Sequence, residues 1–154
     1  MSIPSQKTET TRHFTHLALE LRDNMRRFMQ QKFREHNIDL TYEMHQIMVC
    51  LWGKDGIKQQ ELADLTLKDK ASMTFLIDNL TRRGLVRRTE DATDRRSKPI
   101  YLTAKGKQLG KKVEPLVIEL FTIACSGLKM NEIRECIKAV EKMRDNLKPV
   151  SLNG

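Results

Sequence analysis

In the middle of the chain the spacing of the apolar residues changes from one typical of helices to one typical of strands. This change constrains the fold more than any other feature. Residues 59–65 and 69–83 carry apolar side chains three and four residues apart, as expected of two helices. The connection between them, Thr66-Leu67-Lys68, is short, and we expect Leu62 and Leu65 to face inward on the first helix. Two short helices with a tight connection predict a helix-turn-helix unit.

Directly after this unit, the apolar residues no longer recur at helical spacing. Residues 85–89 and 99–102 are short and rich in residues that favour strands. The stretch between them, residues 90–98, is polar apart from Ala92. A β-hairpin with a charged tip is therefore predicted.

Longer amphipathic helices are predicted on both sides of this segment. Apolar residues with helical spacing run from about residue 8 to 35, and from an N-cap at Thr41 to residue 52. A further helix begins at Thr103, and a last one runs from about 130 to 148 and should end before Pro149. The predicted fold class is mostly α with one small β-hairpin, an α+β arrangement.

Positive charge is concentrated in the same part of the chain. The 154 residues include 28 Lys and Arg against 20 Asp and Glu, a net charge of +8. Residues 82–112 hold 11 of these basic residues and three acids, so this segment alone carries +8. A concentrated field of this kind attracts a polyanion, and a nucleic acid is the first partner to consider.

Other functional classes receive little support. No run of 18 apolar residues is present and the N-terminal segment is polar, which predicts a cytoplasmic protein. His13 and His16 lie three residues apart, but no further ligand completes a metal site at suitable spacing. Neither a nucleophile elbow nor a glycine-rich phosphate loop occurs. We expect no enzymatic activity, no catalytic residue, no metal and no cofactor.

Several local motifs resemble those of the MarR family of bacterial transcription regulators, and the likeness extends over nearly the whole chain. The helix-turn-helix begins with Glu61-Leu62-Ala63, and residues 76–86 (LIDNLTRRGLV) are similar to the family's recognition helix and its exit. The wing signature is matched by Asp94-Arg95-Arg96-Ser97-Lys98 and Leu102-Thr103-Ala104-Lys105-Gly106.

The resemblance implies a single domain over residues 1–154. A winged helix-turn-helix lobe would span 41–102, with a recognition helix at about 69–83 and a wing at about 86–102. Dimerisation helices would flank it at 8–35 and 103–148.

The apolar stripes of these outer helices exceed what a compact lobe could cover, which favours a homodimer. The candidate interface residues are Phe14, Leu17, Leu21, Leu120, Ile133, Ile137 and Val140. A two-fold dimer would bind a palindrome with half-sites about 10 base pairs apart.

A recognition helix reads base edges in the major groove from its N-terminal half. The outward candidates are Lys70, Ser72, Thr74 and Phe75, with Asn79 further along. Taken alone, the polar members are equally well interpreted as ordinary exposed residues, and their position after the predicted turn favours DNA contact. Relatives often carry arginine where this chain has Phe75, which can touch a thymine methyl group or pack on a partner helix.

The predicted wing tip carries Arg95 and Arg96. A narrow minor groove has an enhanced negative potential that attracts guanidinium groups. The resemblance implies that Asp94 orients Arg96, which inserts into the groove, through a charge-assisted pair. The alternative is a solvated turn without such a role.

Phosphate contacts would position the protein rather than specify a sequence. The candidates are Gln59, Gln60, Lys68, Arg82, Arg83, Arg87, Arg88 and Lys98. About eight neutralised phosphates per dimer would give a log-log salt slope of roughly −7. We expect a sequence-specific double-stranded DNA-binding regulator that acts as a repressor. The alternative is a non-specific architectural DNA- or RNA-binding protein.

The resemblance also implies a small aromatic effector, bound where the dimerisation helices meet the DNA-reading lobe. Phe28, Met44, Met48 and Trp52 are the candidate lining residues. The alternative is that they are core residues, because an amphipathic stripe requires side chains of this kind in any case.

Overall fold

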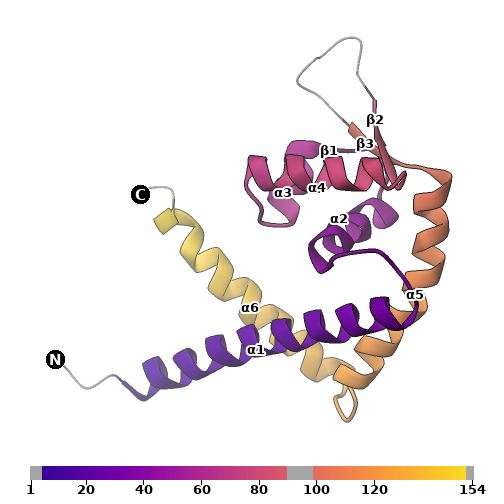
Figure 1. Cartoon of the computed structure of the whole chain (residues 1–154). Helices are drawn as coiled ribbons and strands as arrows, with labels where there is room; N and C mark the ends of the chain where they lie inside the picture. The colour runs from indigo at the N-terminus through magenta and orange to yellow at the C-terminus, as the bar shows by residue number, and fades with distance from the viewer. Residues whose placement is uncertain (1–4, 90–98, 152–154) are drawn as a thin grey trace. The chain divides into compact units, whose positions relative to one another are not determined.

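The computed structural model describes residues 5–89 and 99–151, and it is mostly helical with one small sheet (Figure 1). The elements in chain order are α1 (Gln6–Glu35), α2 (Tyr42–Gly53), β1 (Ile57–Lys58), α3 (Gln59–Leu65), α4 (Lys70–Arg82), β2 (Val86–Arg88), β3 (Pro99–Leu102), α5 (Ala104–Ala124) and α6 (Met130–Ser151). This composition confirms the predicted fold class. The chain divides after Leu120 into two compact units, which are described separately.

Side-chain caps explain where the helices begin. Thr41 Oγ1 accepts a hydrogen bond from the Met44 N–H at 3.2 Å and starts α2. Asp69 accepts one from the Ser72 N–H at 2.7 Å at the start of α4, and this bond holds the pKa of Asp69 below its ordinary value. Thr103 caps α5 in the same way. The predicted N-cap at Thr41 and the predicted helix start at Thr103 are confirmed.

The sheet has three antiparallel strands in the order β1-β3-β2. Val86 pairs with Leu102 and Arg88 with Ile100, which confirms the predicted hairpin pairing. On its other side β3 pairs with β1, where Ile57 lies opposite Ile100. The sequence did not predict β1, because two residues are too few to show a period of two.

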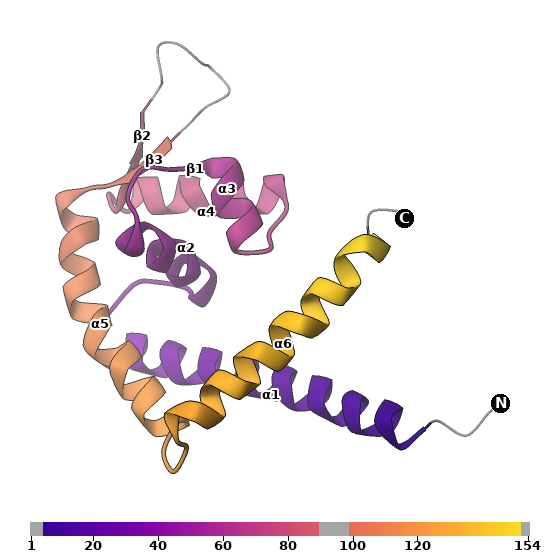
Figure 2. The same ribbon diagram turned by 180° about the vertical axis from the view of Figure 1, so that it is seen from behind.

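The core of the first unit lies around α2, which packs between α1 and α4 (Figure 2). Its fully buried side chains include Phe33, Met29, Ile47, Met48, Leu51, Leu62, Met73, Ile77, Leu80, Ile100 and Val113. Leu62 faces inward as expected, but Leu65 is 58% exposed and that prediction is wrong. A helix turns about 100° per residue, and the buried face of α3 is centred between Leu62 and Ala63. Around the helix axis Leu65 therefore lies about 110° from the centre of that face, on the exposed side.

The end of α4 is bonded to the start of α5, and we call these contacts the α4–α5 junction. The Lys105 ammonium donates to the Arg83 carbonyl at 2.8 Å. The Thr103 hydroxyl donates to the Gly84 carbonyl, and the Thr103 N–H donates to the Leu85 carbonyl at 3.1 Å. Gly84 has φ +69°, a conformation that ends a helix at little cost to glycine.

Two glycines let α5 approach its neighbours closely. A Cβ on Gly106 would lie 2.1 Å from the Leu85 carbonyl oxygen, and one on Gly110 would lie 2.9 Å from Trp52 Nε1. The same Trp52 nitrogen donates to the Gly106 carbonyl at 2.9 Å. Helix propensity alone assigns each of these glycines a cost of about 1 kcal/mol. The structure shows that both make room for α5 to dock.

The second unit contains the end of α5 and helix α6. The predicted end of the last helix before Pro149 is wrong, since α6 continues to Ser151. Proline has a helical φ, so the last turn can continue past Pro149, with the loss of the one backbone hydrogen bond that its missing N–H would have donated. At the start of α6 the Glu132 carboxylate accepts the Lys129 N–H at 2.7 Å. No helix within the described residues is long and apolar enough to cross a membrane.

His45 is buried in the first unit and surrounded by rings. Phe33, Tyr42 and Trp52 lie 5.4, 6.0 and 6.1 Å from its ring centroid. Among the described residues neither ring nitrogen has a hydrogen-bond partner. Burial without a partner disfavours the charged imidazolium and lowers the pKa of His45 to about 4.

The close approach at Gly106 predicts a large effect of one methyl group. Gly106→Ala should destabilise the protein by several kcal/mol, because the added Cβ meets a backbone carbonyl. Gly53 is the matched control, since nothing lies within 4 Å of its Cβ position at the end of α2. Urea unfolding of Gly53→Ala should show unchanged or slightly higher stability. Equal stability of the two variants would contradict the docking role of Gly106.

His45 predicts acid-sensitive stability. Between pH 6.5 and 4 the unfolded state binds a proton that the folded state excludes, so the free energy of unfolding falls as pH falls. The loss attributable to His45 is about 3 kcal/mol at pH 4. In urea unfolding, the free energy of unfolding should therefore fall more steeply for wild type than for His45→Leu as the pH is lowered. The control His13→Leu, which changes an exposed histidine, should keep the wild-type pH dependence.

Candidate nucleic-acid interface

Helix α4 has one buried and one exposed side. Its buried residues Met73, Leu76, Ile77 and Leu80 recur at spacings of three and four and lie on the same side. At about 100° per residue, the opposite side is occupied by the exposed residues Ala71, Phe75, Asp78 and Arg82, which we call the outward stripe. This stripe is exposed on the described chain, as are Lys70, Ser72 and Thr74 in the N-terminal half of α4.

The polar candidates on α4 donate their hydrogen bonds inside the protein. The hydroxyl of Ser72 donates to Asp69 at 3.1 Å, and that of Thr74 donates to the Lys70 carbonyl at 3.0 Å. The Asn79 amide donates to the Phe75 carbonyl at 2.8 Å. Since each hydroxyl has a single hydrogen, Ser72 and Thr74 have no donor left for a base edge in this conformation.

The glutamines at the start of α3 differ in their contacts. Gln59 Nε2 donates to the Thr74 hydroxyl at 2.9 Å and so connects α3 to α4. Gln60 Nε2 donates to Asp64 at 3.1 Å within α3. Lys70 is exposed at the first residue of α4, and Lys68 is half-buried in the preceding turn. The structure therefore brings Gln59, Lys68 and Lys70 to the N-terminal half of α4.

The arginines after α4 separate into two groups. Arg82 is exposed, and its Nη2 donates to Asn79 Oδ1 at 3.0 Å, which orients the guanidinium on the outward stripe. Arg83 instead pairs with Asp39 in the α1–α2 connection, with Nε 3.2 Å from Oδ2. Since this pair engages the guanidinium, we expect Arg83 to hold the α1–α2 connection to the end of α4 rather than to contact phosphate.

The two arginines on the hairpin strand β2 also differ in their contacts. Arg88 Nη1 lies 2.6 Å from Asp78 Oδ1, so this arginine connects β2 to α4. Arg87 is exposed, and its guanidinium lies 5.0 Å from the Tyr101 ring centroid. The predicted tip residues Asp94, Arg95, Arg96 and Lys98 lie outside the described residues.

Asp55 supports the hairpin and was not singled out in the sequence. Its Oδ1 accepts the Leu102 N–H at 2.8 Å and the Gly56 N–H at 3.0 Å. Gly56 has φ +72°, and a Cβ there would lie 2.7 Å from the Tyr101 ring. The Asp-Gly pair is a common turn signal, but the partner strand is identified only in the folded chain.

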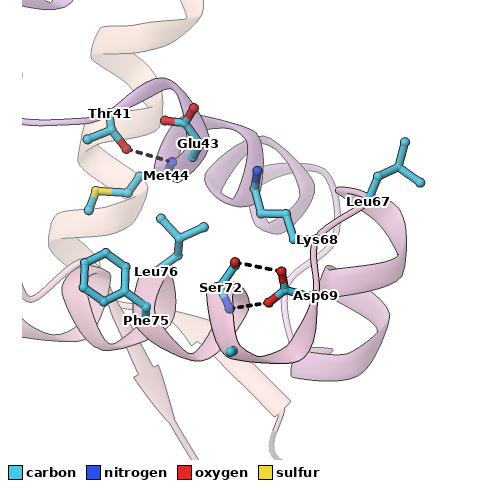
Figure 3. Close-up of a pocket in the computed structure, with 10 residues that line it drawn as sticks. Thr41, Glu43, Met44, Leu67, Lys68, Asp69, Ser72, Phe75 and Leu76 are labelled. Atoms are coloured by element: carbon cyan, nitrogen blue, oxygen red, sulfur yellow. Dashed lines mark hydrogen bonds between the residues drawn. The ribbon is translucent and has the colours of Figure 1, made fainter.

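A groove of about 750 Å³ lies between the start of α2 and the N-terminal half of α4 (Figure 3). Thr41, Met44, Leu76 and Phe75 are among its lining residues. A second cavity of about 680 Å³ lies between α2 and α5. Its wall is mostly apolar, and its charged members are Asp55, Lys107, Lys111 and Glu114.

The candidate effector residues lie in different places in the first unit. Trp52 lines the α2–α5 cavity, whereas Met44 lines the groove beside α4. Met48 is fully buried, and Phe28 packs against the core. Met44 and Met48 therefore belong to the apolar stripe by which α2 fills the core, which is the alternative that the sequence left open.

The candidate dimer residues are mostly accessible on the chain. Phe14, Leu17 and Leu21 are exposed on α1, and Ile137 and Val140 are exposed on α6. Ile133 is half-buried. Leu120 departs from this pattern: it is only 8% exposed and belongs to the core of the first unit. Leu120 is thus covered mostly by its own chain, and its place in the interface stays a prediction.

Candidate metal ligands are scattered over the described part of the chain. No three His, Cys, Asp or Glu residues gather there into a group that could hold an ion. His16 instead lies 3.1 Å from Glu20 on the exposed side of α1.

Comparison with known proteins identifies the family. Residues 40–98 match the model of the MarR family. The transcriptional regulator HosA of Escherichia coli O157:H7 is 31% identical over 132 residues, covering 81% of this chain and 98% of HosA. The regulator TtmR of Methylorubrum extorquens is 30% identical over 109 residues, covering 71% of this chain and 55% of TtmR. The chain therefore spans about half the length of TtmR.

Structural similarity agrees with this result. The crystal structure of the S. aureus MepR–DNA complex has a TM-score of 0.77 and 26% identity, covering 87% of this chain and 98% of MepR. The chain belongs to the MarR family of winged helix-turn-helix transcriptional regulators.

Proposed function

We propose that this protein is a cytoplasmic repressor that binds a palindromic DNA operator as a homodimer and is released by a small aromatic acid. The observation that carries the proposal is the outward stripe of α4, which holds Phe75 and an oriented Arg82 on an exposed helix face. A helix of this kind fits the major groove of B-DNA. Support comes from MepR, a relative in fold whose structure was determined bound to DNA.

The hairpin supplies a second contact in this proposal. The Arg88–Asp78 pair holds β2 against α4, so the wing and the recognition helix approach DNA as one unit. Arg95 and Arg96 would enter the minor groove, oriented by Asp94, while Arg87 and Lys98 would approach phosphates. Lys68, Lys70, Gln59 and Gln60 would contact the backbone near the start of α4.

Dimerisation follows from the apolar residues that each unit leaves exposed. On α1 these are Phe14, Leu17 and Leu21, and on α6 they are Ile137 and Val140. Both sets have the spacing of a helix face, and an apolar face of this length is typical of a subunit interface.

An effector site is supported by the α2–α5 cavity. Val49, Trp52, Val117 and Ile118 offer apolar surface, and the cations Lys107 and Lys111 line the same cavity together with Asp55 and Glu114. A volume of about 680 Å³ lies in the range of small-molecule sites. An aromatic carboxylate matches both features. Its binding would reach the DNA-reading helix because the α4–α5 junction connects α5 to the end of α4.

Operator selectivity tests the DNA-binding proposal. Sites are selected from a pool of random duplexes, and affinity is measured by fluorescence anisotropy at several salt concentrations. The selected palindrome should bind at least about a thousandfold more tightly than random duplex, with a log-log salt slope of roughly −7. Arg82→Gln should lower the slope's magnitude by about 2 per dimer, one for each subunit.

Arg83→Gln is the matched control for Arg82→Gln, because Arg83 is adjacent but paired with Asp39. It should leave the salt slope unchanged. Equal affinity for the selected and random duplexes would instead indicate the architectural alternative.

The effector proposal makes a separate prediction. Aromatic carboxylates of one ring should bind the free protein in isothermal titration calorimetry and dissociate the operator complex, whereas the corresponding neutral amides should not. Lys111→Gln should weaken carboxylate binding by about tenfold, the loss expected for one charge-assisted hydrogen bond. Lys138→Gln on α6 is the control. Operator dissociation that is equal for acids and amides would contradict the role of the lysines.

A further inference from the structure

Phe75 is a large apolar side chain on the surface that the proposed function assigns to DNA. It lies on the outward stripe of α4 and is 64% exposed. Its ring stands beside Leu76 and lines the groove between the start of α2 and the N-terminal half of α4 (Figure 3). The aromatic ring is therefore largely exposed and open to a ligand.

The neighbours of Phe75 leave it as the most suitable base contact at the middle of α4. The hydroxyl hydrogens of Ser72 and Thr74 are donated to Asp69 and to the Lys70 carbonyl. Asn79 donates to the backbone of Phe75 itself and accepts from Arg82. The polar residues on both sides of Phe75 are thus less available to form hydrogen bonds with base edges.

The major groove offers one apolar group to such a side chain. The 5-methyl of thymine projects there, whereas the other base edges present hydrogen-bond donors and acceptors. A phenyl ring cannot satisfy those groups and would desolvate them at a cost. Contact with a methyl group buries apolar surface on both partners and is favourable.

We propose that Phe75 is a specificity-determining residue that reads the 5-methyl group of a thymine in each operator half-site. This inference rests on the proposed function and adds the chemistry by which the operator is chosen. It assigns the sequence preference at this position to apolar contact rather than to hydrogen bonding.

Replacement of thymine by deoxyuridine tests the inference, because it removes only the methyl group. Each thymine of the selected operator is replaced in turn, symmetrically in both half-sites. At one position the substitution should weaken wild-type binding by roughly fourfold per half-site, or about 15-fold for the dimer, the value of one buried methyl group in each half-site.

Variants at position 75 identify the residue responsible. Phe75→Ala should bind the thymine and deoxyuridine operators equally, and Phe75→Leu should retain part of the difference. Phe75→Arg should select guanine at this position, since a guanidinium matches the guanine O6 and N7 acceptors. Leu65→Ala is the matched control: Leu65 is also an exposed apolar residue, on α3, and its replacement should preserve the full discrimination.

The outcomes separate the inference from the function on which it rests. If wild type selects no sequence from the random pool, the proposed function fails. If wild type selects an operator but no thymine-to-deoxyuridine change weakens binding, the Phe75 assignment is overturned alone. It is also overturned if Phe75→Ala, folded by circular dichroism, keeps the wild-type discrimination.

Discussion

The lobe depends on the close docking of α5 against the end of α4. Three successive carbonyls, those of Arg83, Gly84 and Leu85, accept hydrogen bonds from Thr103 and Lys105. The contact requires a residue without Cβ at Gly106, because any side chain would overlap the Leu85 carbonyl. These bonds pair the carbonyls that follow the last turn of α4, so the junction stabilises the end of α4 and closes the hairpin at the same point.

This docking also connects the α2–α5 cavity to the end of α4 through helix α5. The α2–α5 cavity and the end of α4 share helix α5, and Trp52 contacts α5 through the Gly106 carbonyl at 2.9 Å. A ligand that separates α2 from α5 would act on the same residues that hold α4. Coupling then requires only that the ligand prefer one arrangement of these helices over the other.

The chemistry of α4 differs from a first interpretation of its sequence. Ser72, Thr74 and Asn79 stabilise the helix and orient Arg82, so their polar groups serve the protein. What remains outward is a combination of charge and one aromatic ring. A surface of this kind can obtain affinity from phosphates and selectivity from a methyl group, with few direct hydrogen bonds to bases.

Elements with local signals could be predicted from the amino-acid sequence alone. The caps at Thr41 and Thr103, the recognition helix and the hairpin strands were predicted because periodicity and capping involve residues a few positions apart. Tertiary structure decided the pairing of β1, the burial of Leu120 and the exposure of Leu65. It also decided that Arg83 binds Asp39, 44 positions away. These outcomes depend on partners distant in sequence, which spacing and composition do not identify.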